Sequence, residues 1–322
     1  MDDRLRDQAL NLDEVVSKME TEGFRFTKFE LVAEDSCLPV DVEWNYKDMV
    51  HVGFVHSHMS RKFMYIGKDA YTTFDLQKVL GITIPQSAAF YVTHDNRIIV
   101  NTVLFLYVVI VEIVSEAAGD MLTRTTTRYA VGARSRLLRL FIPILQRAIK
   151  SNWRKFTADD RSLRRRRGDL RTQGYGFSDT SPIDHRDTLR ITEKGVMAPL
   201  NRPQYRSELH LSGTGSSVQT IGSDDHLGLQ VFADADAVRI FPRVCPHRGA
   251  CLDAASVSGN IIDCPWHGRK FRALASFPRQ SPTALSVEGP FHRCTYEGGV
   301  LSLETNPSAD INADWTEVWR TV

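Results

Sequence analysis

Two short segments in the C-terminal third decide the fold of that region: CPHRGAC at residues 245–251 and CPWHG at residues 264–268. Each segment pairs one cysteine with one histidine, as C-x-H in the first and as C-x-x-H in the second. Thiolates and imidazoles at such close spacing are typical metal ligands. The intervening residues 248–263 are enough for a pair of strands that brings the two loops together.

This ligand set fits a [2Fe–2S] cluster of the Rieske type. In a Rieske centre one iron takes two thiolates and the other takes two neutral imidazoles, so each loop would supply one sulfur and one nitrogen. The alternative is a structural zinc site with two cysteines and two histidines. Zinc sites rarely combine a C-x-H loop with a C-x-x-H loop. The sequence therefore predicts that a [2Fe–2S] cluster binds to the four ligands Cys245, His247, Cys264 and His267.

At this point the chain resembles Rieske proteins over residues 200–305. The respiratory branch of that family has an extra cysteine in each loop, and the two form a disulfide. Here Cys251 matches the first of them, but Trp266 stands where the second is expected. The pattern therefore resembles the ferredoxin and oxygenase branch. Cys251, Cys37 and Cys294 are expected to be buried free thiols.

A second metal motif lies near the N-terminus. Residues 48–56, DMVHVGFVH, have the spacing D-x-x-H-x-x-x-x-H, which resembles the mononuclear iron motif of Rieske non-haem oxygenases. The resemblance implies that His51 and His56 bind Fe(II). It also implies that Asp48 lies between the two metal centres, hydrogen-bonded to His51 on one side and to the cluster ligand His267 on the other.

The spacing of the two histidines raises a question of geometry. Residues five apart do not share a face of a straight helix. We therefore expect a bend or a helix end between His51 and His56, for which Gly53 is well placed. On a straight helix His58, seven residues after His51, would be the better partner.

A facial triad needs one carboxylate more. In the family it comes from a late helix, in an aromatic-x-x-acid-Asp context that residues 156–160, FTADD, match. The resemblance implies that Asp160 is the ligand; Asp159 is the alternative, about 100° further round the helix. Without a metal, both would be surface charges that balance the six arginines of residues 161–171. We interpret those arginines as a solvated helix face or a subunit contact, with docking of an acidic ferredoxin as a further possibility.

The order of patterns along the chain predicts an α+β fold. A helix is expected within residues 1–30, and strands over most of 40–130, including the alternating VDVEW at 40–44. A helix that Pro143 kinks or splits should follow over 133–170. We predict a helix-grip (START/Bet v1-like) catalytic domain at 1–172, a linker at 173–217, and a small all-β Rieske domain at 218–322. The aromatic residues predicted to line the pocket of the helix-grip domain are Trp44, Phe54, Phe63, Tyr65, Phe90, Phe105 and Tyr107.

The resemblance implies an oxygenase, although the familiar order of Rieske domain first and catalytic domain second is reversed here. Such an enzyme would use O₂ to hydroxylate or oxidatively demethylate an apolar or aromatic small molecule, as a monooxygenase or dioxygenase. Its electrons would come from NAD(P)H through a separate ferredoxin or reductase, since no G-x-G-x-x-G follows a predicted strand. A homo-oligomer, by resemblance a trimer, is expected. The alternative is an electron-transfer or redox-sensing protein whose helix-grip domain binds a ligand without catalytic iron.

Charge and hydropathy narrow the function classes. A net charge of +1 argues against a protein that binds polyanions, so no nucleic-acid role is expected. The longest apolar run, residues 103–111, has half the length of a bilayer span and is followed by Glu112. The N-terminal MDDRLRD lacks the apolar core of a signal peptide. We therefore expect a cytoplasmic protein that makes no membrane contact.

Overall fold

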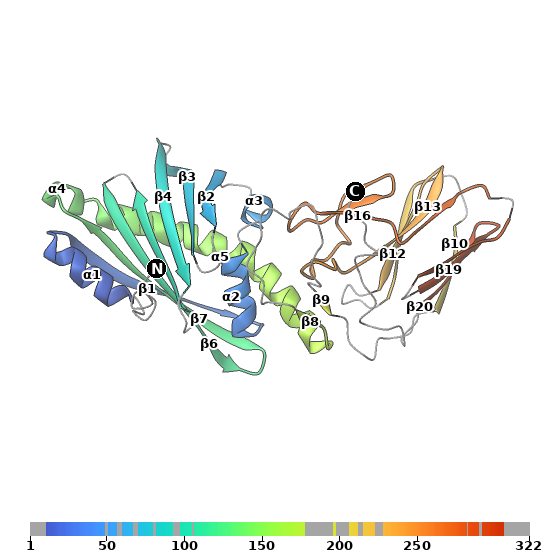
Figure 1. Ribbon diagram of the computed structural model, residues 1–322, viewed down its shortest axis with the longest axis horizontal. Coiled ribbons are helices and arrows are strands. Elements are labelled where there is room, and N and C mark those ends of the chain that lie inside the picture. Colours follow the sequence, from blue (N-terminus) through green and yellow to red (C-terminus); the bar gives the residue numbers. More distant parts are fainter. Residues whose placement is uncertain are drawn as a thin grey trace. The chain divides into compact units, whose positions relative to one another are not determined.

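The computed structural model divides into two compact units, residues 1–168 and 169–322. It describes residues 11–48, 51–56, 60–66, 70–79, 82–92, 97–104, 106–177, 196–197, 206–211, 215–222, 228–281, 283–289 and 292–305. The mixture of a helix-bearing first unit and an all-strand second unit agrees with the predicted α+β class (Figure 1). Among the described residues, no helix is long and apolar enough to cross a membrane.

The first unit is a seven-stranded antiparallel sheet with helices on both of its faces. Its strands lie in the order β1-β7-β6-β5-β4-β3-β2. Their bounds are β1 Arg25–Asp35, β2 Ser60–Ile66, β3 Ala70–Val79, β4 Ile82–Val92, β5 Ile98–Leu104, β6 Tyr107–Gly119 and β7 Leu122–Ala133. Its helices are α1 Leu12–Thr21, α2 Pro39–Lys47, α3 Val52–Val55, α4 Arg136–Arg139 and α5 Ile142–Thr172, the last of which runs on into the second unit.

The long helix α5 packs on one face of this sheet (Figure 1), as the helix-grip arrangement requires. Side chains of β5, β6 and β7 alternate between the two faces, because successive strand residues point in opposite directions. Val109 and Val111 pack with Leu145 of α5, whereas Ile110 packs with Leu12 of α1 on the opposite face. Each face of the sheet thus has its own apolar core.

Two local predictions for this unit need comment. Residues 40–44 were expected to form a strand, which is wrong: they lie within α2, where Pro39 occupies the first helical turn. The Asp41 carboxylate accepts a hydrogen bond from the backbone N–H of Leu38 at 3.3 Å, which caps that helix. The helical region after residue 133 is split as expected: α4 ends at Arg139, and Pro143 lies in the first turn of α5.

In its described residues, the second unit contains only short strands after the end of α5. One sheet has the order β10-β20-β19-β18 and another β11-β12-β13-β17; β14-β15-β16 and β8-β9 form two smaller sheets. The bounds are β8 Gly176–Phe177, β9 Val196–Met197, β10 Arg206–His210, β11 Ser217–Ile221, β12 Leu229–Ala233, β13 Ala237–Pro242, β14 Val257–Ser258, β15 Ile261–Asp263, β16 Lys270–Arg272, β17 Ala275–Pro278, β18 Leu285–Gly289, β19 His292–Glu297 and β20 Val300–Thr305. Strand β10 falls inside the predicted linker, yet it pairs with β20.

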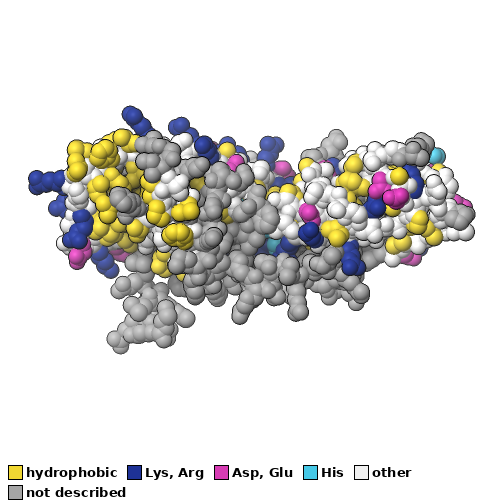
Figure 2. Space-filling view, turned by 90° about the horizontal axis from the view of Figure 1, so that it is seen from above, with side chains coloured by type: hydrophobic (Ala, Val, Ile, Leu, Met, Phe, Trp, Pro, Cys, Tyr) yellow, Lys and Arg dark blue, Asp and Glu magenta, His cyan; other side chains and the backbone are white. Residues whose placement is uncertain are grey.

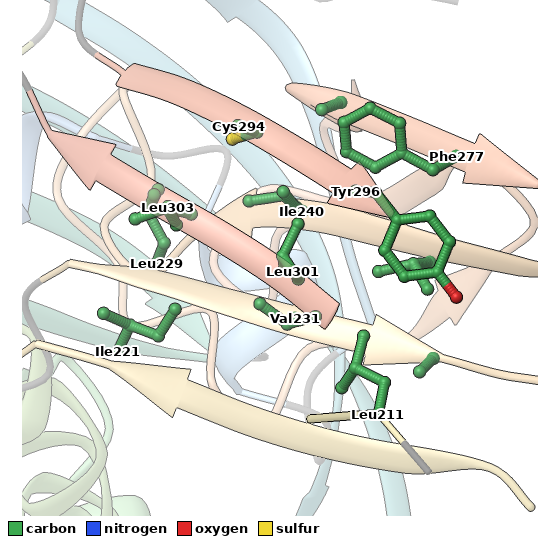
Figure 3. Close-up of a cluster of buried hydrophobic side chains, with 13 residues drawn as sticks. Leu211, Ile221, Leu229, Val231, Ile240, Phe277, Cys294, Tyr296, Leu301 and Leu303 are labelled. Atoms are coloured by element: carbon green, nitrogen blue, oxygen red, sulfur yellow. The ribbon is translucent and has the colours of Figure 1, made fainter. Parts of the chain in front are cut away.

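The core of the second unit lies between the two four-stranded sheets. Figure 3 shows Ile240 and Phe277 from one sheet packed with Tyr296 and Leu301 from the other. The Cys294 thiol lies in the same core, where burial raises its pKa to about 12. Such a thiol is a small apolar group and has no thiolate chemistry at neutral pH. The two motif loops leave this framework after β13 and after β15.

Exposed hydrophobic side chains occur mainly on the first unit. In Figure 2 they form yellow patches with Lys and Arg among them. The most exposed are Leu137 and Leu140 of the α4 region, at 66% and 73%. Surface apolar groups of this kind are common in globular proteins, and by themselves they assign no function.

Candidate functional site

Three side chains of the first unit converge on one point in a metal-binding arrangement. They are His51, His56 and Asp160, which are all buried and each offer one ligand atom, with these atoms within 4.8 Å of one another. The Asp160 Oδ1 atom lies 3.3 Å from His51 Nε2 and 3.0 Å from His56 Nε2. Two imidazoles and one carboxylate on one side of a centre form the 2-His-1-carboxylate facial triad that binds non-haem Fe(II).

The end of a short helix brings the two histidines together. His51 caps the start of α3 and His56 caps its end, so only four helical residues separate them. The backbone leaves the helix at His56, with φ −96° and ψ 70°. The expected interruption thus lies at His56 itself, whereas Gly53 lies inside the helix. As a result the two rings meet at a centroid distance of 5.5 Å. His58 lies outside the described residues.

The polar atoms of this group fit a metal better than they fit one another. In the described part of the chain, three buried atoms of this group make no hydrogen bond: both ring nitrogens of His51 and the Oδ1 atom of Asp160. Buried polar atoms without a partner cost free energy, about 1–3 kcal/mol each. A cation among Oδ1 and the two Nε2 atoms would satisfy two of these three atoms, His51 Nε2 and Asp160 Oδ1, together. This observation supports a metal centre independently of any motif.

Asp159 contacts the same histidine from the opposite side of the ring. Its Oδ2 atom lies 3.1 Å from His56 Nδ1, while Nε2 of that ring faces Asp160. A carboxylate on the outer nitrogen of a metal-binding histidine selects the tautomer and fixes the ring orientation. The adjacent acidic residues therefore have different positions: Asp160 lies inside the group of ligand atoms and Asp159 lies behind a ligand.

A buried ionic network supports Asp160 on the side away from the histidines. Arg164 donates to Asn45 Oδ1 at 2.8 and 3.0 Å and to Asp35 Oδ2 at 3.0 Å. Its Nη2 atom also lies 3.5 Å from Asp160 Oδ2. One turn further on, Arg167 donates to Asp41 at 2.8 Å and stacks over the Trp44 ring at 4.0 Å.

The interpretation of the arginine run as a solvated face is therefore wrong for its central residues. Arg164, Arg166 and Arg167 are buried, and only Arg161 and Arg165 of that turn are exposed. Asp160, Arg164 and Arg167 are spaced four and then three residues apart, which places them on one helix face. This spacing was the sequence signal that they share one environment. Their partners Asp35 and Asp41 are too distant in sequence for any local pattern to indicate.

Local electrostatics favour the charged forms of His56 and Asp160. Burial opposes a charged His56, but the neighbouring Asp160 and Asp159 outweigh it and raise the pKa of His56. Burial also disfavours ionised Asp160, but the imidazoles of His51 and His56 and the charge of Arg164 hold the pKa of Asp160 well below its ordinary value. An ionised carboxylate at neutral pH is the form that binds a cation.

Asp48 is buried at the C-terminal cap of α2. The predicted hydrogen bond between Asp48 and His51 is not formed, since both ring nitrogens of His51 are without a hydrogen-bond partner in the described part of the chain. The predicted hydrogen bond between Asp48 and His267, which belong to different units, stays a prediction.

A cavity of about 240 Å³ opens beside the triad, between the sheet and α5. Of the aromatic residues predicted to line it, Phe90 does; Trp44 stacks on Arg167, and Tyr107 donates a hydrogen bond to the backbone of Leu138. The side chains of Phe54, Phe63, Tyr65 and Phe105 lie outside the described residues. Aromatic lining residues that the pattern of strands did not indicate are Tyr46, Tyr71, Tyr129, Trp153 and Phe156.

In the second unit the two motif loops have the same backbone hydrogen bonds. Cys245 N–H donates to Ala250 at 2.8 Å and Gly249 N–H donates back to Cys245 at 2.9 Å. The equivalent pairs in the second loop are Cys264 to Arg269 at 2.7 Å and Gly268 to Cys264 at 2.8 Å. Gly249 and Gly268 have φ of +86° and +61°, a conformation that favours glycine. Each loop is thus a tight turn around its cysteine.

The predicted cluster ligands meet across these two loops. The rings of His247 and His267 lie edge to face, with centroids 4.9 Å apart. Burial raises the pKa of the Cys264 thiol, and the adjacent Cys245 adds to the rise, so the two sulfurs are close neighbours. Two buried sulfurs and two imidazoles side by side fit the split ligand set of a Rieske cluster. None of the five cysteines forms a disulfide, and Cys251 is half-buried rather than buried.

A comparison with known protein families finds a match within the second unit. Residues 204–289 match the family described as the Rieske [2Fe–2S] domain, and this domain implies a [2Fe–2S] cluster. The match includes both motif loops. A sequence comparison with curated proteins finds no significant match.

Solved structures resemble this chain over less than half of its length. The protein TTHA0849 from Thermus thermophilus has a TM-score of 0.38 at 10% identity and covers 42% of this chain and 95% of its own. A START superfamily protein from Mycobacterium smegmatis has a TM-score of 0.30 at 10% identity, covering 40% and 99%. Norcoclaurine synthase from Thalictrum flavum has a TM-score of 0.34 at 9% identity, covering 39% and 80%.

Proposed function

We propose that the chain is an oxygenase in which a Rieske cluster in the second unit supplies electrons to a mononuclear iron held by His51, His56 and Asp160. The observation that carries the proposal is the convergence of these three ligand atoms within 4.8 Å at the wall of a cavity. A chain that combines a Rieske domain with such a triad has both an electron donor and a centre for oxygen chemistry.

The proposed iron ligands and the residues that contact them have defined tasks in this proposal. His51, His56 and Asp160 would hold Fe(II), which would supply the oxidising chemistry with O₂. Asp159 holds the Nε2 atom of His56 toward the iron, and Arg164 orients the outer oxygen of Asp160. In a hydroxylation one oxygen atom enters the substrate and the other leaves as water, with protons from solvent and electrons from the cluster.

Partners and electron route remain proposals of the same kind. The electrons would reach the cluster from NAD(P)H through a separate ferredoxin or reductase. Asp48 and His267 would form the link between the cluster and the iron, between subunits of a homo-oligomer. An Asp48→Asn variant should then keep its iron and its cluster but reoxidise the reduced cluster more slowly in air. Stopped-flow absorption of the cluster measures that rate; an unchanged rate would remove Asp48 from the route.

Iron and acid-labile sulfide analysis tests the proposal directly. The reconstituted protein should hold the two irons of a [2Fe–2S] cluster and one further iron. His51→Ala and Asp160→Ala should each lose only that further iron and keep the cluster absorption. His210→Ala, which changes an exposed histidine of the second unit, is the matched control and should lose nothing.

A second measurement reports on the ligand set itself. Nitric oxide added to the Fe(II)-loaded protein should give the EPR signal of a high-spin non-haem iron nitrosyl, absent from His51→Ala. If the wild-type protein holds only cluster iron after reconstitution, the oxygenase proposal fails. The electron-transfer or redox-sensing alternative, in which the cavity binds a ligand without iron chemistry, would then describe the protein.

A further inference from the structure

The lining of the cavity restricts the charge of the compound it can bind. Among the described residues that line the cavity, Asp160 is the only Asp, Glu, Lys or Arg, and His51 and His56 are the only histidines. Arg164 stands nearby, but its guanidinium already donates to Asp35 and Asn45. Away from the triad, a carboxylate bound in the cavity would lose its hydration without gaining a cation, which is costly. The lining therefore favours a neutral ligand.

The same lining presents hydrogen-bond donors without partners. Apart from His51 and Asp160, three of the described lining residues have a buried polar atom that makes no hydrogen bond: Asn45 Nδ2, Thr127 Oγ1 and Trp153 Nε1. The amide orientation of Asn45 is fixed, because its Oδ1 atom accepts two hydrogen bonds from Arg164. All three groups can donate, and two of them only donate. A ligand that accepts hydrogen bonds would remove the cost of leaving these groups unpaired.

Two of the donors lie at different positions along α5, whose lining residues run from Leu145 to Asp160 with Trp153 about midway. Asn45 lies beside Arg164 and so at the triad end. Trp153 precedes Asp160 by seven residues, which places both on one helix face, two turns or about 10 Å apart along the axis. Both side chains lean toward the N-terminus of the helix, so the offset between the two residues along the axis is kept. An acceptor bound to Trp153 Nε1 is thus held away from the triad.

The volume limits the size of the ligand. A cavity of about 150 Å³ lined by apolar side chains is sufficient for benzene. The cavity here measures about 240 Å³, which leaves room for a second ring or a short substituent.

We propose that the cavity binds a neutral one- or two-ring compound with a carbonyl oxygen, which accepts a hydrogen bond from Trp153 Nε1. The carbonyl at Trp153 lies about two helical turns from Asp160, and the ring system extends from it toward the triad, so the carbon next to the triad is the part of the ring system farthest from the carbonyl. The ligand class depends only on the cavity, whereas the position of the reacting carbon rests on the proposed oxygenase function.

Three bicyclic probes of similar shape test the ligand class by titration calorimetry on the full chain. They are 1-tetralone as the neutral ketone, tetralin as the hydrocarbon, and 1,2,3,4-tetrahydro-1-naphthoate as the anion. We expect 1-tetralone to bind about ten-fold more tightly than tetralin, as one hydrogen bond to an otherwise unpaired donor allows. The anion should bind more weakly than both. Equal affinities for ketone and hydrocarbon, tightest binding of the anion, or no binding of any probe would overturn the inference.

Variants identify the donor. Trp153→Phe should abolish the preference for 1-tetralone and leave the affinity for tetralin nearly unchanged, which also shows that the variant is folded. Thr127→Val, a change of similar size at another unpaired lining group, should keep most of the preference. Retention of the full preference in Trp153→Phe would remove the indole from the site.

A separate arm distinguishes this inference from the proposed function. The ketone preference should persist in His51→Ala, which is expected to lack the mononuclear iron. In iron-loaded wild type, paramagnetic broadening of the 1-tetralone proton resonances should be strongest for the protons farthest from the carbonyl. Strongest broadening next to the carbonyl would overturn the orientation. Absence of bound iron together with a persistent ketone preference would overturn the oxygenase proposal but not the ligand class.

Discussion

The two candidate metal centres of this chain are built in opposite ways. In the cluster loops each cysteine and its histidine come from one tight turn, and backbone hydrogen bonds hold the turn. The mononuclear group instead joins residues that are distant in sequence, such as His56 and Asp160. Buried ion pairs between side chains hold those elements in place. A backbone-held site therefore depends on its own loop, and a side-chain-held site depends on distant partners.

Removal of a cluster thiol should have the largest effect, confined to one centre. Cys264→Ser should abolish the visible absorption of the cluster and its labile sulfide, because a serine hydroxyl does not replace a soft thiolate ligand. The mononuclear iron should remain. Iron and sulfide analysis measures both. Cys251→Ser changes a half-buried thiol outside the ligand set and should keep the cluster; loss of the cluster in that variant would contradict the assignment.

Removal of a distant side chain should damage the mononuclear group through stability. Arg164→Met would leave Asp35 and Asp160 buried without their shared cation. We expect the free energy of unfolding of the first unit to fall by about 3–5 kcal/mol, as for other broken buried ion pairs. Urea denaturation measures this change. The exposed Arg165 offers a control, because Arg165→Met should change it by less than about 0.5 kcal/mol. Similar effects of both substitutions would contradict the comparison.

A change within one turn tests the backbone-held centre. In Gly249→Ala the alanine would have to adopt φ +86°. Its Cβ would lie 2.8 Å from Leu170 Cδ1 and 3.0 Å from Phe177 Cε1. We expect a loss of about 1–3 kcal/mol and faster bleaching of the cluster in air. Gly259→Ala shares the positive φ, +56°, but meets open space. It should therefore cost only about 1 kcal/mol and leave the bleaching rate unchanged. Equal bleaching of both variants would show that the contact is unimportant.

The smallest expected effects concern two carboxylates: Asp13, which is held by side chains, and Asp234, which is held mainly by the backbone. Hydrogen bonds from the side chains of Lys28 and Arg128 lower the pKa of Asp13 to about 2. The backbone N–H of Ala237, with the side chain of Arg239 next, lowers the pKa of Asp234 to about 2. A lowered pKa stabilises the protein above the ordinary value of 3.8, and this contribution is lost as the pH falls toward 2.

Asp13→Ala and Asp234→Ala should therefore each lower the stability at pH 7 by less than about 1 kcal/mol. Either difference should shrink when urea denaturation is repeated below pH of about 4. Salt at about 1 M should screen the contribution of Asp13 more than that of Asp234, whose main partner is a backbone dipole. The same salt dependence at both positions would contradict the distinction.

The same distinction explains what the sequence could predict. The cluster ligands follow from spacing within two loops, and the match to a Rieske domain over residues 204–289 agrees with them. The alternation at 40–44 indicated a strand, but Pro39 and the capping carboxylate of Asp41 start a helix there. The pairing of Arg164 with Asp35 joins residues 129 apart and leaves no local trace. Asp159 was considered only as a rival of Asp160, although the two contact the same histidine from different sides.

The position of Asp160 on α5 also limits how the sequence can change in length. Trp153 and Asp160 line the cavity from one face of a continuous helix that begins at Ile142. A single inserted or deleted residue between them would rotate one relative to the other by about 100°. It would turn Asp160 away from the two histidines, or the indole away from the cavity. Insertions and deletions should therefore be tolerated in the turns between strands but not within this stretch of α5.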